Sequence, residues 1–247
     1  MVRPSREGAA AGSPAAAGLR RVSGEGQVRA SYGFVMRSVP WWILLSSVCA
    51  PVLLVVGWTV SALLQGPGYD PAAKTISILA ASGADGYWVM TPALVALGLC
   101  HLTTASGLHL AALPGRLTLG AGGLSAMMLA LFPAPSSGGS LGHGAVVTAG
   151  FSLLAVWPVL AVRRTAAPER TTGRPPAAGR APWGLRHWPS LMATTLMWLG
   201  GGWFLLSLSV QGTAGVAERV LTFAQSFWPL VVVLSCVRHT DNDEEAV

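Results

Sequence analysis

Several polar side chains that could bind a ligand or transfer protons lie near the ends of long apolar segments of this sequence. They offer carboxyl, ammonium, hydroxyl, imidazole and guanidinium groups: Asp70, Lys74, Ser77, Asp85, His143, Glu218 and Arg219. A carboxyl group beside an imidazole is a common pair for general acid–base catalysis, and both must lie within hydrogen-bond reach in one cavity. We therefore treat these seven residues as one candidate ligand-binding or catalytic cluster.

The same residues also have structural explanations. Asp70 before Pro71 is typical of a helix cap, and Asp85 followed by Gly86 is typical of a turn. Glu218 falls in the first turn of an expected helix, where the helix dipole favours a negative charge. The sequence leaves both interpretations open: a ligand or catalytic site, and a purely structural role.

Two further ionisable residues, His101 and His109, lie inside an apolar segment. If a helix begins at Tyr87, His101 lies roughly 21 Å along it. Ionisable groups inside a bilayer are costly, so each histidine is a candidate for a proton relay or a ligand site. The structural alternative is a neutral imidazole that is hydrogen-bonded to a neighbouring helix.

The composition indicates a membrane protein. Hydrophobic residues make up 52 % of the chain and charged residues 11 %, with a mean hydropathy of +0.54, whereas soluble domains carry about 25 % charged residues. The net charge of +6 does not indicate nucleic-acid binding, because the basic residues flank apolar blocks without interleaved aromatic side chains. The expected partners are membrane lipids, and either a membrane-protein partner or a homo-oligomer is compatible with the sequence.

The apolar blocks predict an all-α, polytopic membrane protein with six transmembrane helices, since each block approaches the length needed to cross a bilayer. The predicted spans cover residues 41–64, 87–113, 117–135, 143–162, 187–210 and 217–237. The other long segments are predicted to be a disordered basic arm, a flexible linker and an acidic tail, at residues 1–40, 163–186 and 238–247.

The basic residues predict the orientation of these spans. If the N-terminus is cytoplasmic, Lys74 and Arg219 are the only two of the sixteen Lys and Arg residues that fall on the outer side. Cytoplasmic loops carry the excess of positive charge, and five or seven spans would place a basic loop outside. We therefore expect a multi-pass protein of the plasma membrane, with both termini in the cytoplasm and the candidate cluster at the outer face.

Small residues in the third predicted span indicate how the helices pack. Gly120, Gly122 and Gly123 are followed closely by Ser125 and Ala126. Such a face lets the backbone of a neighbouring helix approach closely within a membrane.

No motif with an established chemistry occurs in the sequence. The H-E-x-x-H and P-loop patterns are missing, and the G-x-S-x-G spacing at Gly138–Gly142 falls in a loop between two apolar blocks rather than between a strand and a helix. Cys49, Cys100 and Cys236 lie inside apolar blocks without metal-ligand spacing. We expect neither a metal ion nor a cofactor.

Three short stretches in a fixed order resemble a known family. They are Tyr69-Asp70-Pro71 running into Thr75-Ile76-Ser77, Phe132-Pro133 followed by His143-Gly144-Ala145, and Gly215-Val216-Ala217-Glu218-Arg219. The chain resembles, from about Cys49 to Val237, the bacterial integral membrane family catalogued as domain of unknown function 998. The resemblance implies six membrane helices and no particular activity.

Three functions are compatible with these observations. The first is a non-catalytic accessory or sensing protein that binds a lipid or a partner at its outer face, which the scarcity of buried ionisable groups favours. The second is an intramembrane enzyme that acts on a lipid or prenyl chain, with one of the acids and His143 as the reacting pair. The third is a small transporter, although the sequence shows no continuous polar path across the membrane.

Overall fold

The computed structural model describes residues 39–135, 139–163, 181–210 and 212–245. Most of the predicted arm (1–40) and of the predicted linker (163–186) lies outside these ranges. In the predicted tail (238–247), the backbone is described to residue 245 and the side chains to His239.

Helices make up the described part of the chain, which contains no β-strand. The long ones are α2 (Trp41–Leu63), α4 (Tyr87–Gly107), α5 (Leu113–Met128), α6 (Leu141–Leu160), α7 (His187–Ser209) and α8 (Ala214–Glu245), and the short ones are α3 (Ile76–Leu79) and the 3-10 helix η2 (Trp183–Leu185). All of the long helices except α5 are long and apolar enough to cross a membrane, α8 over Ala214–His239. The prediction of an all-α membrane protein is confirmed.

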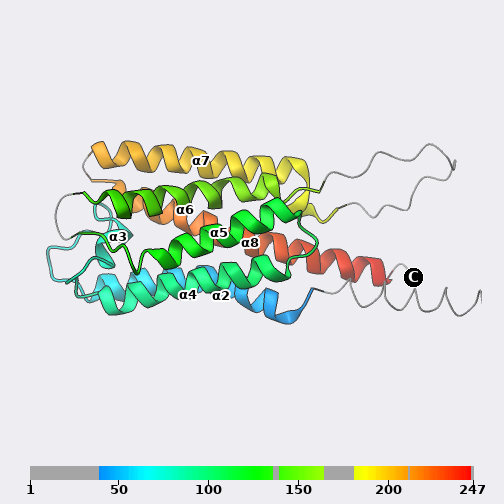
Figure 1. The fold of residues 1–247 in the computed structure, drawn as a ribbon, viewed down its shortest axis with the longest axis horizontal. Coiled ribbons are helices and arrows are strands. Elements are labelled where there is room, and N and C mark those ends of the chain that lie inside the picture. The colour runs from blue at the N-terminus through cyan, green and yellow to red at the C-terminus, as the bar shows by residue number, and fades with distance from the viewer. Residues whose placement is uncertain (1–38, 136–138, 164–180, 211, 246–247) are drawn as a thin grey trace, which may run out of the picture. The chain divides into compact units, whose positions relative to one another are not determined.

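The third predicted span corresponds to α5, which is shorter than expected. Its 16 residues extend over about 24 Å, less than the roughly 30 Å of a bilayer core. Beyond Met128 the chain forms turns and reaches Pro133 and Pro135, and proline cannot continue a hydrogen-bonded helix. In Figure 1, α5 nevertheless lies alongside α4 and α6, and the chain turns at opposite ends of the bundle before and after it.

The second predicted span, 87–113, is also longer than the helix that the structure shows. α4 ends at Gly107, and a turn over residues 108–112 leads into α5. His109 is exposed in this turn, where its carbonyl oxygen accepts a hydrogen bond from Arg163. His109 is therefore outside the helix that was expected to hold it, and it is not a buried ionisable group.

The six long helices form a closed ring. Each packs mainly against two neighbours, in the order α2, α4, α5, α6, α7 and α8, and α8 closes the ring against α2. α6 and α8 also contact each other directly. The chain alternates direction from helix to helix, so the turn between α4 and α5 lies at one end and the α2–α4 loop with α3 at the other, which we call the α3 end (Figure 1).

The closest helix contact lies between α4 and α5. A Cβ atom added to Gly123 would lie 2.7 Å from the carbonyl oxygen of Gly98, and one added to Gly122 would lie 2.6 Å from the side chain of Leu154 on α6. The prediction that small residues in this segment permit close helix approach is confirmed.

The end of the predicted flexible linker is packed against the bundle. Leu185 is buried, and the backbone N–H of Gly184 donates to Ser235 Oγ on α8 at 3.0 Å. Residues 181–186 thus differ from the expectation, because an apolar Trp-Gly-Leu turn can bury itself against a neighbouring helix.

Candidate functional site

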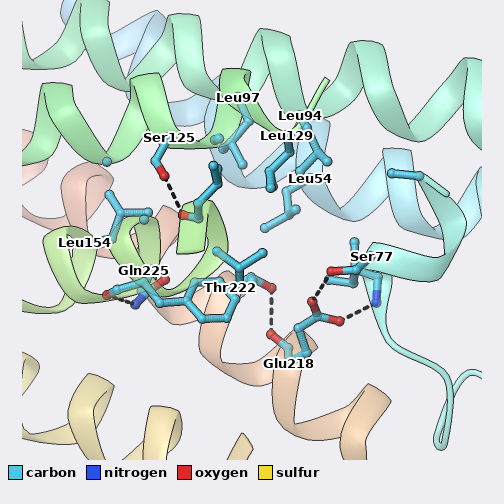
Figure 2. Close-up of a pocket in the computed structure, with 18 of the residues that line it drawn as sticks. Leu54, Ser77, Leu94, Leu97, Ser125, Leu129, Leu154, Glu218, Thr222 and Gln225 are labelled. Atoms are coloured by element: carbon cyan, nitrogen blue, oxygen red, sulfur yellow. Dashed lines mark hydrogen bonds between the residues drawn. The ribbon is translucent and has the colours of Figure 1, made fainter. Parts of the chain in front are cut away.

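Glu218 joins α8 to α3 across more than half of the sequence. Its side chain is only 2 % exposed, and its two carboxyl oxygens accept hydrogen bonds from the backbone N–H of Ile76 and, at 3.1 Å, from Ser77 Oγ. Figure 2 shows both bonds beside the pocket that α3 and α8 help to form. Glu218 thus stabilises α3, four residues long, by accepting from a backbone N–H at its start.

Arg219, the next residue, holds the segment just before α3. Its Nη1 donates to the carbonyl oxygens of Pro71 at 2.7 Å and Lys74 at 3.0 Å, and its Nη2 donates to Tyr69 Oη at 2.7 Å. Burial raises the pKa of the Tyr69 hydroxyl and the nearby guanidinium opposes this, so the neutral phenol accepts from Arg219. Glu218 and Arg219 of α8 therefore hold two parts of the α2–α4 loop, namely α3 and the segment that precedes it.

Four residues of the predicted cluster lie outside the pocket: Arg219, which holds the loop as described above, and three exposed residues. Asp70 is exposed, and its Oδ1 accepts from the backbone N–H of Ala72 at 2.9 Å. It stabilises a turn and is not the predicted helix cap, because the next helix, α3, begins only at Ile76. Lys74 is exposed, and its backbone carbonyl oxygen accepts the hydrogen bond from Arg219. Asp85 is exposed at the turn before α4. These side chains do not share a cavity with His143 and Glu218.

The pocket lies inside the helix ring toward the α3 end. Residues of α2, α3, α4, α5, α6 and α8 line it, and its empty space is about 730 Å³ with open solvent included. Most of the lining is apolar, and Figure 2 labels five of its leucines: Leu54, Leu94, Leu97, Leu129 and Leu154. Ligand pockets are usually apolar with a few placed polar groups.

Ser77, His143 and Glu218 are the members of the predicted cluster that line this pocket. His143 is half-buried near the start of α6, and its Nδ1 lies 2.9 Å from the carbonyl oxygen of Phe132. A carbonyl can only accept, so Nδ1 carries the proton and Nε2 is an acceptor. Tertiary packing thus brings three of the predicted residues to one cavity.

His101 also lines the pocket, deep in the bundle, with 1 % of its surface exposed. The sequence interpretation missed Gln225 of α8, which lines the pocket at 1 % exposure. The spacing of the polar residues could have predicted Gln225. Glu218, Thr222 and Gln225 follow the pattern i, i+4, i+7 and therefore share one helix face. All three line the pocket.

Within the described ranges, no group of three His, Cys, Asp or Glu side chains could hold a metal ion. The polar side chains that line the pocket can form hydrogen bonds with a bound molecule. A carboxyl group and an imidazole, as in Glu218 and His143, can also exchange protons with it.

The fold and pocket define the class: an all-helical membrane protein with a mainly apolar pocket inside its helix ring. The chain belongs to the family described as "Protein of unknown function (DUF998)", whose model matches residues 48–235. The match begins in α2, ends in α8 and includes every residue that lines the pocket. No curated protein and no solved structure matches the chain.

Proposed function

We propose that this protein is a non-catalytic accessory or sensing protein that binds the apolar chain of a membrane lipid in the pocket. The observation that carries the proposal is the mainly apolar pocket inside the helix bundle, whose lining includes five leucine, three alanine and two valine side chains. A lipid chain is already shielded from water in the bilayer, so its binding to such a lining depends on close van der Waals packing.

The contacts of α3 favour a sensing role at the α3 end. Ile76, Ser77 and Ala80 line the pocket, and the same short helix is attached to α8 through Glu218. A lipid chain bound in the pocket would contact α3 directly. Binding would therefore shift the α2–α4 loop, which a partner protein at the outer face would contact. Both carboxyl oxygens of Glu218 already accept hydrogen bonds, which favours an anchoring role over a reacting one.

Filling the pocket tests this proposal. Val147 of α6 lines the pocket and is half-buried, so Val147→Phe should occupy the space and reduce the lipid that remains with the purified protein several-fold. Val52→Phe on α2, whose native side chain is 52 % exposed, is the matched control and should leave the retained lipid unchanged. Lipid per protein is measured by mass spectrometry of solvent extracts. Equal retention by both folded variants would contradict the proposal.

The second candidate is an intramembrane enzyme that acts on a lipid or prenyl chain. It is favoured by one observation, the presence of Ser77, His143 and Glu218 in one cavity. An enzyme would convert an added membrane-lipid extract with time, and His143→Asn would abolish the conversion. Binding without conversion is the result expected for the accessory protein.

We further propose six crossings of the plasma membrane, α5 included, with both termini in the cytoplasm. Arg116, Arg163, Arg186 and Arg238 lie at helix ends opposite the α3 end, whereas Lys74 and Arg219 lie at the α3 end, which is the charge asymmetry of a cytoplasmic and an outer face.

Reporter fusions test this topology. Alkaline phosphatase should be active when fused after Ser140 and inactive after Val247, and green fluorescent protein should show the reverse. Phosphatase activity at the C-terminus would refute the six-span orientation.

A further inference from the structure

A buried histidine at the deep end of the pocket lacks hydrogen-bond partners. His101 is 1 % exposed and lines the pocket, and neither of its ring nitrogens has a partner among the described residues. A neutral imidazole offers one donor and one acceptor. Leaving such groups buried and unpaired is costly, so a bound molecule that pairs with them binds more tightly.

Gln225 presents a second unpaired group to the same cavity. Its Nε2 donates to the carbonyl oxygen of Phe151 at 2.9 Å, which fixes the amide orientation, and its Oε1 has no partner among the described residues. The neighbouring hydroxyls are already used: Ser125 donates to the Val146 carbonyl, and Ser226 to the Phe223 carbonyl. The buried polar atoms of the pocket lining that have no hydrogen bond at all within the described part of the chain are therefore the two ring nitrogens of His101 and Gln225 Oε1.

Both side chains lie far from the α3 end: His101 is 14 residues beyond the start of α4, or about 21 Å along its axis. Gln225 is two helical turns beyond Glu218 on α8, or about 10 Å along the axis, and the leucines of the pocket centre belong to the same cavity. Figure 2 shows Gln225 and Leu154 on one side of the pocket and Glu218 with Ser77 on the other. A molecule that reaches both ends must therefore have an apolar middle.

We propose that the lipid bound in this pocket carries a hydroxyl group, which His101 and Gln225 hold at the deep end. This inference rests on the proposed function. A hydroxyl both donates and accepts, so it can donate to Gln225 Oε1 and accept from the N–H of His101. The ligand class is thus a neutral long-chain alcohol, and an ether or hydrocarbon of the same shape would leave Gln225 Oε1 unpaired.

The charges of the lining exclude an ionic group at this position. Among the described residues that line the pocket, Glu218 is the only Asp, Glu, Lys or Arg, and it lies at the other end with both oxygens bonded to α3. An ion beside His101 would be buried without a counter-charge, which is far more costly than burying a hydroxyl.

Competition binding tests the inference on the full-length protein in lipid nanodiscs. Radiolabelled farnesol, an isoprenoid alcohol, is displaced by unlabelled farnesol or by farnesyl methyl ether, which has the same chain but no donor. We expect the alcohol to bind about tenfold more tightly, since one lost hydrogen bond of about 1.4 kcal/mol corresponds to that factor. His101→Phe should remove this preference by weakening the alcohol and leaving the ether unchanged.

Each outcome is decisive. Equal affinity of the wild-type protein for the alcohol and the ether means that the deep end holds only water, which overturns the inference but leaves the binding of an apolar chain intact. Binding of neither ligand overturns the proposed function as well. A preference that persists in His101→Phe and in Gln225→Met refutes the assignment of these residues, and the wild-type comparison remains valid if either variant fails to fold.

Discussion

Replacing Gly123 with alanine is expected to destabilise the folded protein by about 1–3 kcal/mol. The new Cβ would lie 2.7 Å from the carbonyl oxygen of Gly98 and 2.9 Å from Cβ of His101. These neighbours are backbone and the root of a buried side chain, so neither can move without separating α4 from α5. The melting temperature of the purified protein should fall by roughly 2–4 °C for each kcal/mol.

Gly202→Ala on α7 is the matched control. Nothing lies within 4 Å of a Cβ atom at this position, and alanine is favoured over glycine inside a helix by up to about 1 kcal/mol. The two substitutions are chemically identical, so they should change the melting temperature in opposite directions. A Gly123→Ala variant as stable as Gly202→Ala would show that α4 and α5 are not in such close contact.

Replacing Glu218 with alanine is expected to release α3. The buried backbone N–H of Ile76 would lose its acceptor and Ser77 would lose its partner, at a cost of about 1–3 kcal/mol. Amide hydrogen exchange reports such local opening. Exchange over residues 69–80 should therefore accelerate by about ten- to hundredfold, because each 1.4 kcal/mol corresponds to a factor of ten.

Thr222→Val provides the comparison on the same face of α8. Thr222 Oγ1 donates to carbonyl oxygens of its own helix, those of Glu218 and Arg219, so its loss should leave exchange in residues 69–80 unchanged. If Glu218→Ala also leaves this exchange unchanged while the protein remains folded, Glu218 does not anchor the loop. Its carboxyl group would then be free for the enzymatic role.

The membrane helices could be predicted wherever apolar length alone determines them. The segment at Trp41–Leu63 ends within one residue of the predicted span, because a polar loop follows it. The end of α4 could not be predicted in this way. Leu108 and Ala111 are apolar because they are buried at 2 % and 1 % exposure in a turn, and hydropathy does not distinguish an apolar turn from an apolar helix.

The candidate site depended on contacts that sequence spacing does not contain. Asp70 and Glu218 looked equivalent as acids near helix ends, yet Asp70 is an exposed turn residue and Glu218 is buried against α3. His101 and His109 were predicted to lie on one span. His101 lines the pocket, whereas His109 lies in an exposed turn. Burial depends on which helices meet around a residue, and those neighbours come from distant parts of the chain.

The sequence by itself determined the class of the protein, since a bilayer requires long apolar helices and their composition is visible locally. It also determined the family, through short motifs in a fixed order, and the polar residues from which a site could be built. Only the tertiary structure decided which of them share a cavity and which hold the loop. The physical reason is that the pocket arises where α2, α4, α5, α6 and α8 meet around α3, and the packing of α2 against α8 joins segments that are far apart in the sequence.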